Sequence, residues 1–237
     1  MTQAGGARAR VREELTREIK QTARRQLAEH GSAALSLRAV ARELGMVSSA
    51  VYRYFPSRDD LLTALITEAY DAVGSAAEAA ESAVRRRDLL GRWMALARAV
   101  RAWASANPHE YALIFGSPVP RYQVPAGTDD PASRILLLLV GVLTDAARAG
   151  ASSTAADHRI PKAVRSDLTA LRRSVAPELG EQQLAWAVMA WTELIGSISF
   201  ELFGHLHNLI SNYQAYFEFQ MRGVAERLGL TEFARAR

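Results

Sequence analysis

The sequence contains no cysteine, and this absence removes several kinds of chemistry at once. Neither a disulfide framework, nor a thiolate metal site, nor a cysteine nucleophile is available to the chain. The basic N-terminus has no apolar segment behind it, and the longest apolar run, residues 135–140, is much shorter than a membrane span. We therefore expect a cytoplasmic protein that is neither secreted nor embedded in a membrane.

The sequence also lacks the short motifs of common enzymes. It has no H-E-x-x-H, no glycine loop of the kind that cradles phosphates, and no G-x-S-x-G. We expect no enzyme, no cofactor and no metal site. Two classes stay open as alternatives to the interpretation developed below, a small helical enzyme and an architectural or scaffold protein.

The residues that are present favour helices. The chain has 237 residues, of which 49% are hydrophobic, enough for a folded protein. Ala, Leu, Arg and Glu are abundant, and no stretch of β-branched residues alternates with period two, so we predict an all-α fold. Periodicity, caps and breakers predict helices at residues 12–30, 36–44, 48–55, 57–85, 88–106, 108–115, 130–149, 162–175, 182–207 and 211–228.

The excess positive charge is confined to the first quarter of the chain. Residues 1–60 carry eleven Lys and Arg against seven Asp and Glu, whereas the remaining residues carry eighteen of each. A basic segment joined to a neutral one suggests that the first meets a polyanion and the second does something else. Arginines that are simply solvated on helix surfaces would give the same charge balance.

Residues 36–55 predict two short helices joined by a tight turn. Ser36 can cap the first helix, and Gly45 can adopt the positive φ that ends it. Val40, Leu44 and Val51 are the apolar positions that would hold the two helices together. This is the pattern of a helix-turn-helix, whose second helix a DNA major groove receives.

The segment SLRAVARELGMVSSAVYRYFPSRDDLLTALI, residues 36–66, resembles the DNA-binding region of the TetR family of bacterial regulators. Many members carry Ser where this chain has Val47, so we expect Ser48 to cap the recognition helix here. The resemblance implies a three-helix DNA-binding domain at residues 12–72, followed by a helical-bundle domain for effector binding and dimerisation at residues 73–237. A shorter segment, residues 200–208, resembles the subgroup whose C-terminal domain is named for Trp, His and Gly positions.

The resemblance also indicates which residues meet double-stranded DNA. Ser36 and Arg58 are expected at phosphates, Arg53 and two serines at base edges, and Tyr54 at the backbone. The expected DNA-binding residues are Ser36, Val47, Ser48, Ser49, Arg53, Tyr54 and Arg58. Tyr52 and Phe55 are expected in the core beside Val51. Residues before the first helix, with Arg8, Arg10 and Arg12, would form a flexible arm on the DNA or a solvated tail.

The two last helices carry apolar residues on more than one side, which predicts burial on more than one side. In the family this implies a homodimer through these helices and a palindromic operator, although a monomer with a larger core is an alternative. Large side chains between helices would line a cavity for a small hydrophobic effector. The expected ligand-binding residues are Trp93, Trp103, Tyr111, Phe115, Trp186 and Trp191. With DNA on one domain and effector on the other, we expect a transcriptional repressor that the effector releases from its operator.

Overall fold

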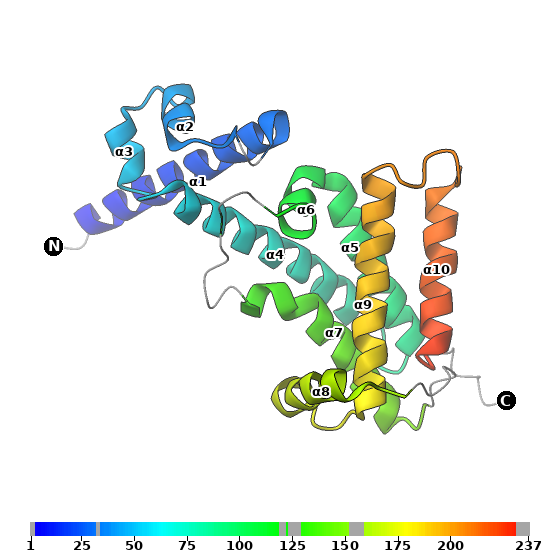
Figure 1. Ribbon diagram of the computed structural model, residues 1–237. Helices are drawn as coiled ribbons and strands as arrows, with labels where there is room; N and C mark the ends of the chain where they lie inside the picture. The colour runs from blue at the N-terminus through cyan, green and yellow to red at the C-terminus, as the bar shows by residue number, and fades with distance from the viewer. Residues whose placement is uncertain (1–2, 32–33, 119–121, 123–128, 152–158, 231–237) are drawn as a thin grey trace. The chain divides into compact units, whose positions relative to one another are not determined.

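The computed structural model describes residues 3–31, 34–118, 122, 129–151 and 159–230, and all the regular structure in these ranges is helical. The all-α prediction is confirmed. The helices are α1 (Gln3–His30), α2 (Leu37–Glu43), α3 (Ser48–Tyr52), α4 (Arg58–Ser82), α5 (Leu89–Ala106), α6 (Pro108–Phe115), α7 (Asp129–Arg148), α8 (Lys162–Val175), α9 (Glu181–Leu202) and α10 (Tyr213–Arg227), as Figure 1 shows.

The chain divides into two compact units. Unit 1 comprises residues 1–70 and 107–128, and unit 2 comprises residues 71–106 and 129–237. The long helix α4 therefore begins in unit 1 and ends in unit 2. Unit 1 also includes α6. The domain boundaries expected from the sequence would place this helix in the C-terminal domain, residues 73–237.

Unit 1 is built on α1, with α2 and α3 on one side of it (Figure 1). One apolar core joins these helices to the first turns of α4. Its fully or largely buried members are Ile19, Ala23, Leu27, Leu35, Leu37, Val40, Ala41, Val51, Phe55, Leu61, Leu62 and Leu65. Charged contacts add α6 to the unit: Arg24 donates to Glu110 on α6 at 2.7 Å and to Glu68 on α4 at 2.6 Å.

Two helix ends differ most from the sequence prediction, the start of α1 and the end of α9. Helix α1 begins at Gln3, so Arg8, Arg10 and Arg12 lie on a helix and form neither a flexible arm nor a tail. Helix α9 ends at Leu202, before the predicted residue 207, because Gly204 adopts a φ of 79° and closes the helix. His205 and His207 consequently lie in the turn that follows and not on α9.

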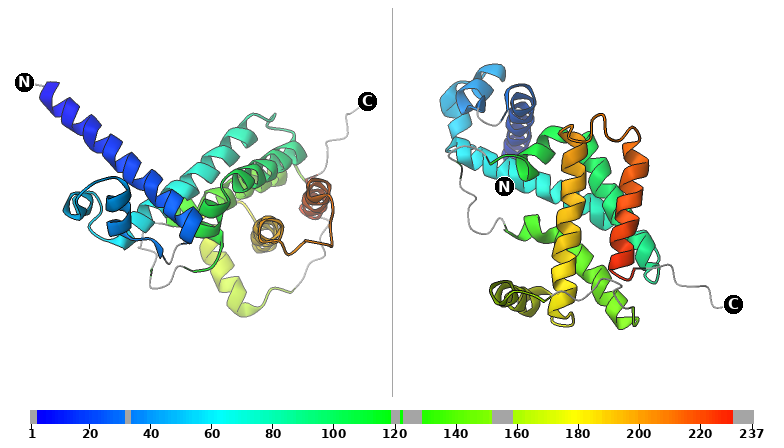
Figure 2. Two further views of the ribbon diagram at one scale, coloured as in Figure 1. Left: turned by 90° about the horizontal axis from the view of Figure 1, so that it is seen from above. Right: turned by 45° about the vertical axis from the view of Figure 1, so that its right-hand side comes forward.

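Unit 2 is centred on α9, which packs on α5, α7, α8 and α10. The long apolar helices pack side by side, as the two views of Figure 2 show for α9 and α10. Trp93 is fully buried, and its Nε1 donates to the carbonyl oxygen of Met221 at 2.8 Å. Arg92 is also buried, between Glu81 and Asp145.

In the residues described, no helix is long and apolar enough to cross a membrane. The same residues include no group of three or more His, Asp or Glu side chains arranged to hold a metal ion.

Candidate nucleic-acid interface

Helix α2 ends in a tight glycine turn that aims the chain into α3. Gly45 has a φ of 65°, the amide of Met46 donates to the Ala41 carbonyl at 2.8 Å, and the amide of Gly45 donates to the Arg42 carbonyl at 3.2 Å. These are the two hydrogen bonds of a Schellman motif, in which the positive φ favours glycine. The helix-turn-helix predicted for this segment is confirmed.

Helix α3 begins at Ser48, with Val47 at the N-cap position, so the expected cap at Ser48 is wrong. Valine has no side-chain acceptor, and the α3 cap has no side-chain hydrogen bond. Val47 is 70% exposed, Ser49 and Arg53 are exposed, and Ser48 is half-buried. Val51 is fully buried beneath the helix. One face of α3 thus packs on the core of unit 1, and the opposite face is exposed to solvent.

The three aromatic residues that follow Val51 divide differently from the sequence expectation. Phe55 is buried as predicted, but Tyr52 is 42% exposed and therefore is not a core residue. Phe55 is four residues beyond Val51 and shares its face, whereas Tyr52 is one residue on and points elsewhere. Tyr54 is half-buried against the core, and the Arg12 guanidinium lies over its ring at 5.3 Å from the centroid.

Ser36 and Arg58, the two residues expected at phosphates, both lie at the start of a helix. Ser36 occupies the N-cap position of α2, with no side-chain hydrogen bond at the cap. Arg58, in the first turn of α4, donates from Nε to the Leu35 carbonyl at 3.2 Å and lies 3.5 Å from Asp59. Ser57 caps α4, since its Oγ accepts from the amide of Asp60 at 3.1 Å.

The arginines of unit 1 fall into a paired and an unpaired set. On the α1–α2 contact, Glu43 accepts from Gln26 at 3.0 Å and from Arg25 at 2.9 Å, and these hydrogen bonds lower the pKa of the Glu43 carboxyl. Arg38, Arg42 and Arg53 are exposed and, among the residues described, have no carboxylate at ion-pair distance. Their charge is free to act on an external anion.

Sequence reasoning missed two members of the unpaired set. Arg38 and Arg42 lie four residues apart on α2 and so share one face of that helix. The first helix of a helix-turn-helix crosses the DNA backbone, which makes this pair candidate phosphate contacts. The four-residue spacing in the sequence was the signal that would have identified them.

The six residues expected around an effector lie in different units. Tyr111 and Phe115 lie on α6 of unit 1, where Tyr111 is fully buried and their ring centroids are 5.1 Å apart. Trp93 and Trp103 lie on α5, and Trp186 and Trp191 on α9, all in unit 2. Trp93 is a core residue held by its hydrogen bond to Met221.

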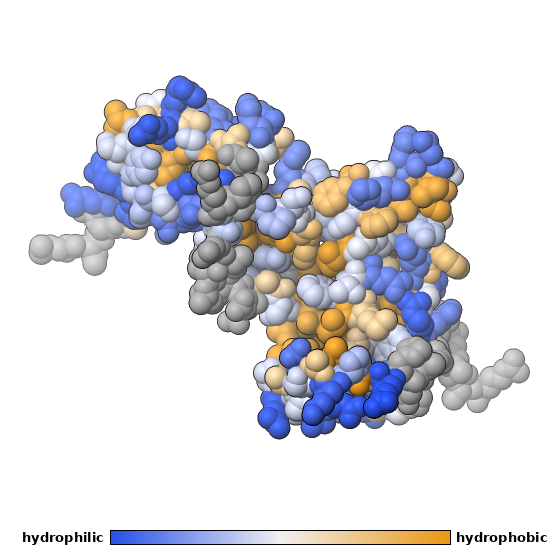
Figure 3. All heavy atoms as spheres, in the orientation of Figure 1, coloured by the Kyte–Doolittle hydropathy of each residue, from blue (hydrophilic) through white to orange (hydrophobic). Residues whose placement is uncertain are grey.

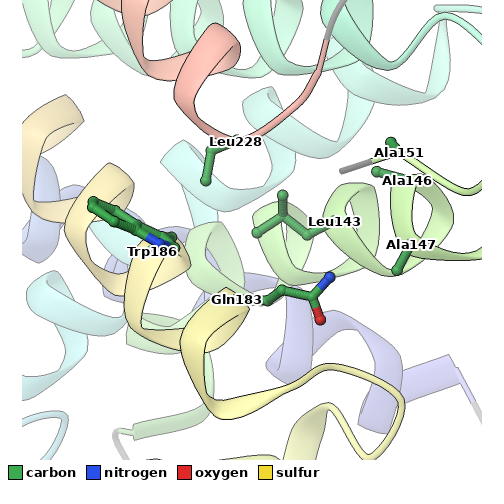
Figure 4. A pocket seen from close by; sticks show the side chains of 7 residues that line it. All are labelled: Leu143, Ala146, Ala147, Ala151, Gln183, Trp186 and Leu228. Carbon is green, nitrogen blue, oxygen red and sulfur yellow. The ribbon is translucent and has the colours of Figure 1, made fainter. Parts of the chain in front are cut away.

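Trp186 lines two openings in unit 2. One, shown in Figure 4, is apolar apart from Gln183 and has a volume of about 20 Å³, room for one water molecule. The other is a groove of about 260 Å³ between α9 and α10, lined by Trp186, Met189, Ala190, Glu193, Val224, Arg227 and Leu228. The Nε1 of Trp191 is buried and has no hydrogen-bond partner among the residues described.

Two family models match the chain. Residues 19–65 match the model for bacterial regulatory proteins of the tetR family, and residues 93–224 match that for the tetracyclin repressor-like C-terminal domain. The first match covers α1 from Ile19 onwards, the helix-turn-helix and the start of α4. The second covers most of unit 2 and the α6 segment.

Curated relatives are similar over most of their length. The chain is 39% identical, over 208 residues, to the HTH-type transcriptional regulator Rv1816 of Mycobacterium tuberculosis strain H37Rv, covering 84% of this chain and 85% of that protein. The regulator Mb1846 of Mycobacterium bovis gives the same figures.

Solved structures agree with the fold. The crystal structure of regulatory protein SCO4313 has a TM-score of 0.74 at 33% identity, covering 91% of this chain and 97% of that chain. The TetR family regulator PfmR from Thermus thermophilus has a TM-score of 0.55 at 17% identity, covering 86% and 97%, and so supports the fold alone.

Proposed function

The chain belongs to the TetR family of bacterial transcriptional regulators, and we propose that it is a repressor that a small hydrophobic effector releases from a palindromic operator. The single observation that carries the DNA-binding part is the exposed face of α3. Ser49 and Arg53 are exposed there, and the opposite face is anchored by Val51 in the core. A rigid helix with a free guanidinium is suited to read base edges in a major groove.

Each side chain on this surface has a proposed role. Arg53 donates to guanine, Ser48 and Ser49 donate to or accept from base edges, and Val47 contacts a thymine methyl group. Contacts to phosphates position the helix without reading sequence. We propose Ser36, Arg58 and Tyr54 for these contacts, together with the α2 pair Arg38 and Arg42.

The first prediction concerns Arg53. Arg53→Ala is expected to weaken specific binding by about 1–3 kcal/mol, the usual value of a good bidentate base contact. The melting temperature should hardly change, because the side chain is exposed and has no ion pair among the residues described. The measurement is a titration, at fixed salt, of a duplex that the wild-type protein has selected from a random library.

Two variants act as controls for Arg53→Ala. Arg53→Lys keeps the charge but loses the bidentate geometry, so a base contact predicts that it too loses specificity. Arg85→Ala removes an exposed arginine from unit 2 and should leave the affinity unchanged. An Arg53→Ala protein with wild-type affinity would place the recognition surface elsewhere.

The proposed dimer uses α9 and α10. Met189 and Phe200 are each 54% exposed and lie eleven residues apart, three helical turns, so they share one face of α9. Phe219 on α10 is 73% exposed. Figure 3 shows apolar residues gathered over the upper ends of these two helices. Side chains of this size are normally covered by a partner when they form a patch. A two-fold dimer would then match a palindromic operator.

The proposed effector site is the groove between α9 and α10 that Trp186 lines. Its volume of about 260 Å³ is near the lower end of small-molecule sites. Trp186, Ala190, Val224 and Leu228 give it apolar walls. Arg227 pairs with Glu193 at its rim. An uncharged ligand suits these walls, because an unpaired charge is costly to bury.

The second prediction is that a hydrophobic molecule that quenches tryptophan fluorescence will also loosen the operator complex, because coupling between two sites is reciprocal. At a hundredfold excess over its Kd it should stabilise the protein by about 2.7 kcal/mol. Trp186→Leu should weaken its binding about tenfold through loss of an aromatic contact. Trp103→Phe serves as the control, since Trp103 is not among the lining residues. Stabilising compounds that leave operator affinity untouched would favour an effector-free regulator.

A further inference from the structure

The first turns of α1 extend beyond the core of unit 1. Every residue from Gly6 to Glu14 is exposed, and the first buried residue of the helix is Ile19. Arg8 therefore lies about 16 Å along the helix axis before the core begins. The left panel of Figure 2 shows these turns projecting past α2 and α3. Apart from the contact of Arg12 with Tyr54, these turns bury nothing in unit 1, so the stability of unit 1 does not explain the extension.

The extension carries its charges in a definite arrangement. Along α1 the core face is marked by Ile19, Ala23 and Leu27, and at about 100° per residue the same face carries Arg8 and Arg12. Glu13, Glu14 and Arg10 point away from that face. Among the residues described, neither Arg8 nor Arg12 has a carboxylate at ion-pair distance. The charged side chains on the core side of the extension are thus all basic.

The same face is continuous with the recognition surface. The Arg12 guanidinium lies over the ring of Tyr54, 5.3 Å from the ring centroid. Tyr54 directly follows Arg53 in the chain. Arg8 lies one turn beyond Arg12, about 6 Å further along the axis. Phosphates on one DNA strand are spaced about 3.4 Å along the duplex axis, so the pair spans one to two phosphate steps.

We propose that the α1 extension is a second DNA-contact element, in which Arg8 and Arg12 bind backbone phosphates flanking the base pairs that α3 reads. This inference rests on the proposed operator binding and extends it. Charge complementarity selects the occupant, because two unpaired arginines beside a recognition helix face a polyanion. Arg12 also fixes the ring of Tyr54 and so positions it against the backbone.

The test compares two double variants of the full chain. R8Q/R12Q removes the basic face, and R10Q/R17Q removes the same charge from other faces of the same helix. The probe is a duplex that the wild-type protein selects from a random library, made in one form trimmed to the selected motif and one extended by flanking base pairs. Affinities are measured over a series of salt concentrations, and melting temperatures confirm that the variants fold.

We expect R8Q/R12Q to flatten the slope of log Kobs against log salt by about 1.8 per half-site, at about 0.9 for each phosphate that is no longer neutralised. It should also lose the extra affinity that the extended duplex gives the wild type, whereas R10Q/R17Q should keep it. Equal slopes for the two variants, or equal losses on trimmed and extended duplexes, would overturn the inference while leaving operator binding intact. A wild-type protein that selects no duplex would instead remove the proposed function, and this inference with it.

Discussion

Replacing Arg92 by alanine is expected to lower the free energy of unfolding of unit 2 by about 3–5 kcal/mol, the usual cost of removing one partner from a buried ion pair. The Arg92 side chain is 2% exposed, and it contacts Glu81 at 2.5 Å and Asp145 at 2.8 Å. It also donates to the Arg86 carbonyl at 3.1 Å. The substitution would leave the largely buried Glu81 carboxylate of α4 without a cation among the residues described, whereas Asp145 of α7 would keep Arg86 at 2.8 Å and Arg148 at 3.7 Å.

Tryptophan fluorescence during urea unfolding measures this effect, because all four tryptophans lie in unit 2. Arg98→Ala is the matched control, since Arg98 pairs with Glu218 at 2.6 Å but its side chain is 49% exposed. Exposed pairs contribute about 0–1 kcal/mol. Removing the charges together, as R92M with E81Q and D145N, should recover much of the loss. A cost for R92A no larger than that for R98A would show that water or the neighbouring arginines compensate the carboxylates that lose Arg92.

A charge placed at Phe217 is expected to have an equally large effect, but of a different kind from the same charge at Phe200. Phe217 is 1% exposed and packs beneath the Arg101 guanidinium, 5.3 Å from the ring centroid. Loss of a buried phenylalanine costs about 3–5 kcal/mol, and a buried carboxylate adds to that cost. Phe217→Glu should therefore unfold unit 2.

Phe200→Glu should instead dissociate the proposed dimer and leave each protomer folded, because Phe200 is 54% exposed. Sedimentation would give the mass of each variant, and circular dichroism would report its helix content. The contrast separates the core role of Phe217 from the interface role proposed for Phe200. A wild-type protein that is monomeric at micromolar concentration yet binds a palindromic site tightly would remove α9 and α10 as the interface.

Much of the helix-turn-helix could be predicted because its determinants are local. Gly45 ends α2 through its own backbone conformation, and Ser57 caps α4 through an amide three residues away. Val40 and Val51 follow the spacing of helix faces and are both fully buried. Interactions within a few residues leave their pattern in the sequence, and such patterns need no knowledge of the fold.

Other parts of the site depended on groups that are distant in the chain. Tyr52 was expected in the core and Tyr54 at the DNA backbone, but contacts with the core and with Arg12 of α1 leave Tyr52 exposed and Tyr54 half-buried. Trp93 was expected beside an effector, but its Nε1 finds an acceptor in Met221, 128 residues further on. Which aromatic side chain is core and which lines a groove is decided by such neighbours.

The sequence by itself determined the helical class, the position of the helix-turn-helix and the confinement of excess charge to its first quarter, since each depends on composition or on spacing within a few turns. The tertiary structure decided that α6 joins unit 1 through Arg24 and Glu110, that Arg92 is held between α4 and α7, and that Arg8 and Arg12 extend the core face of α1. The physical reason is that burial and ion pairing are properties of packed neighbours, which only the folded chain brings within contact distance.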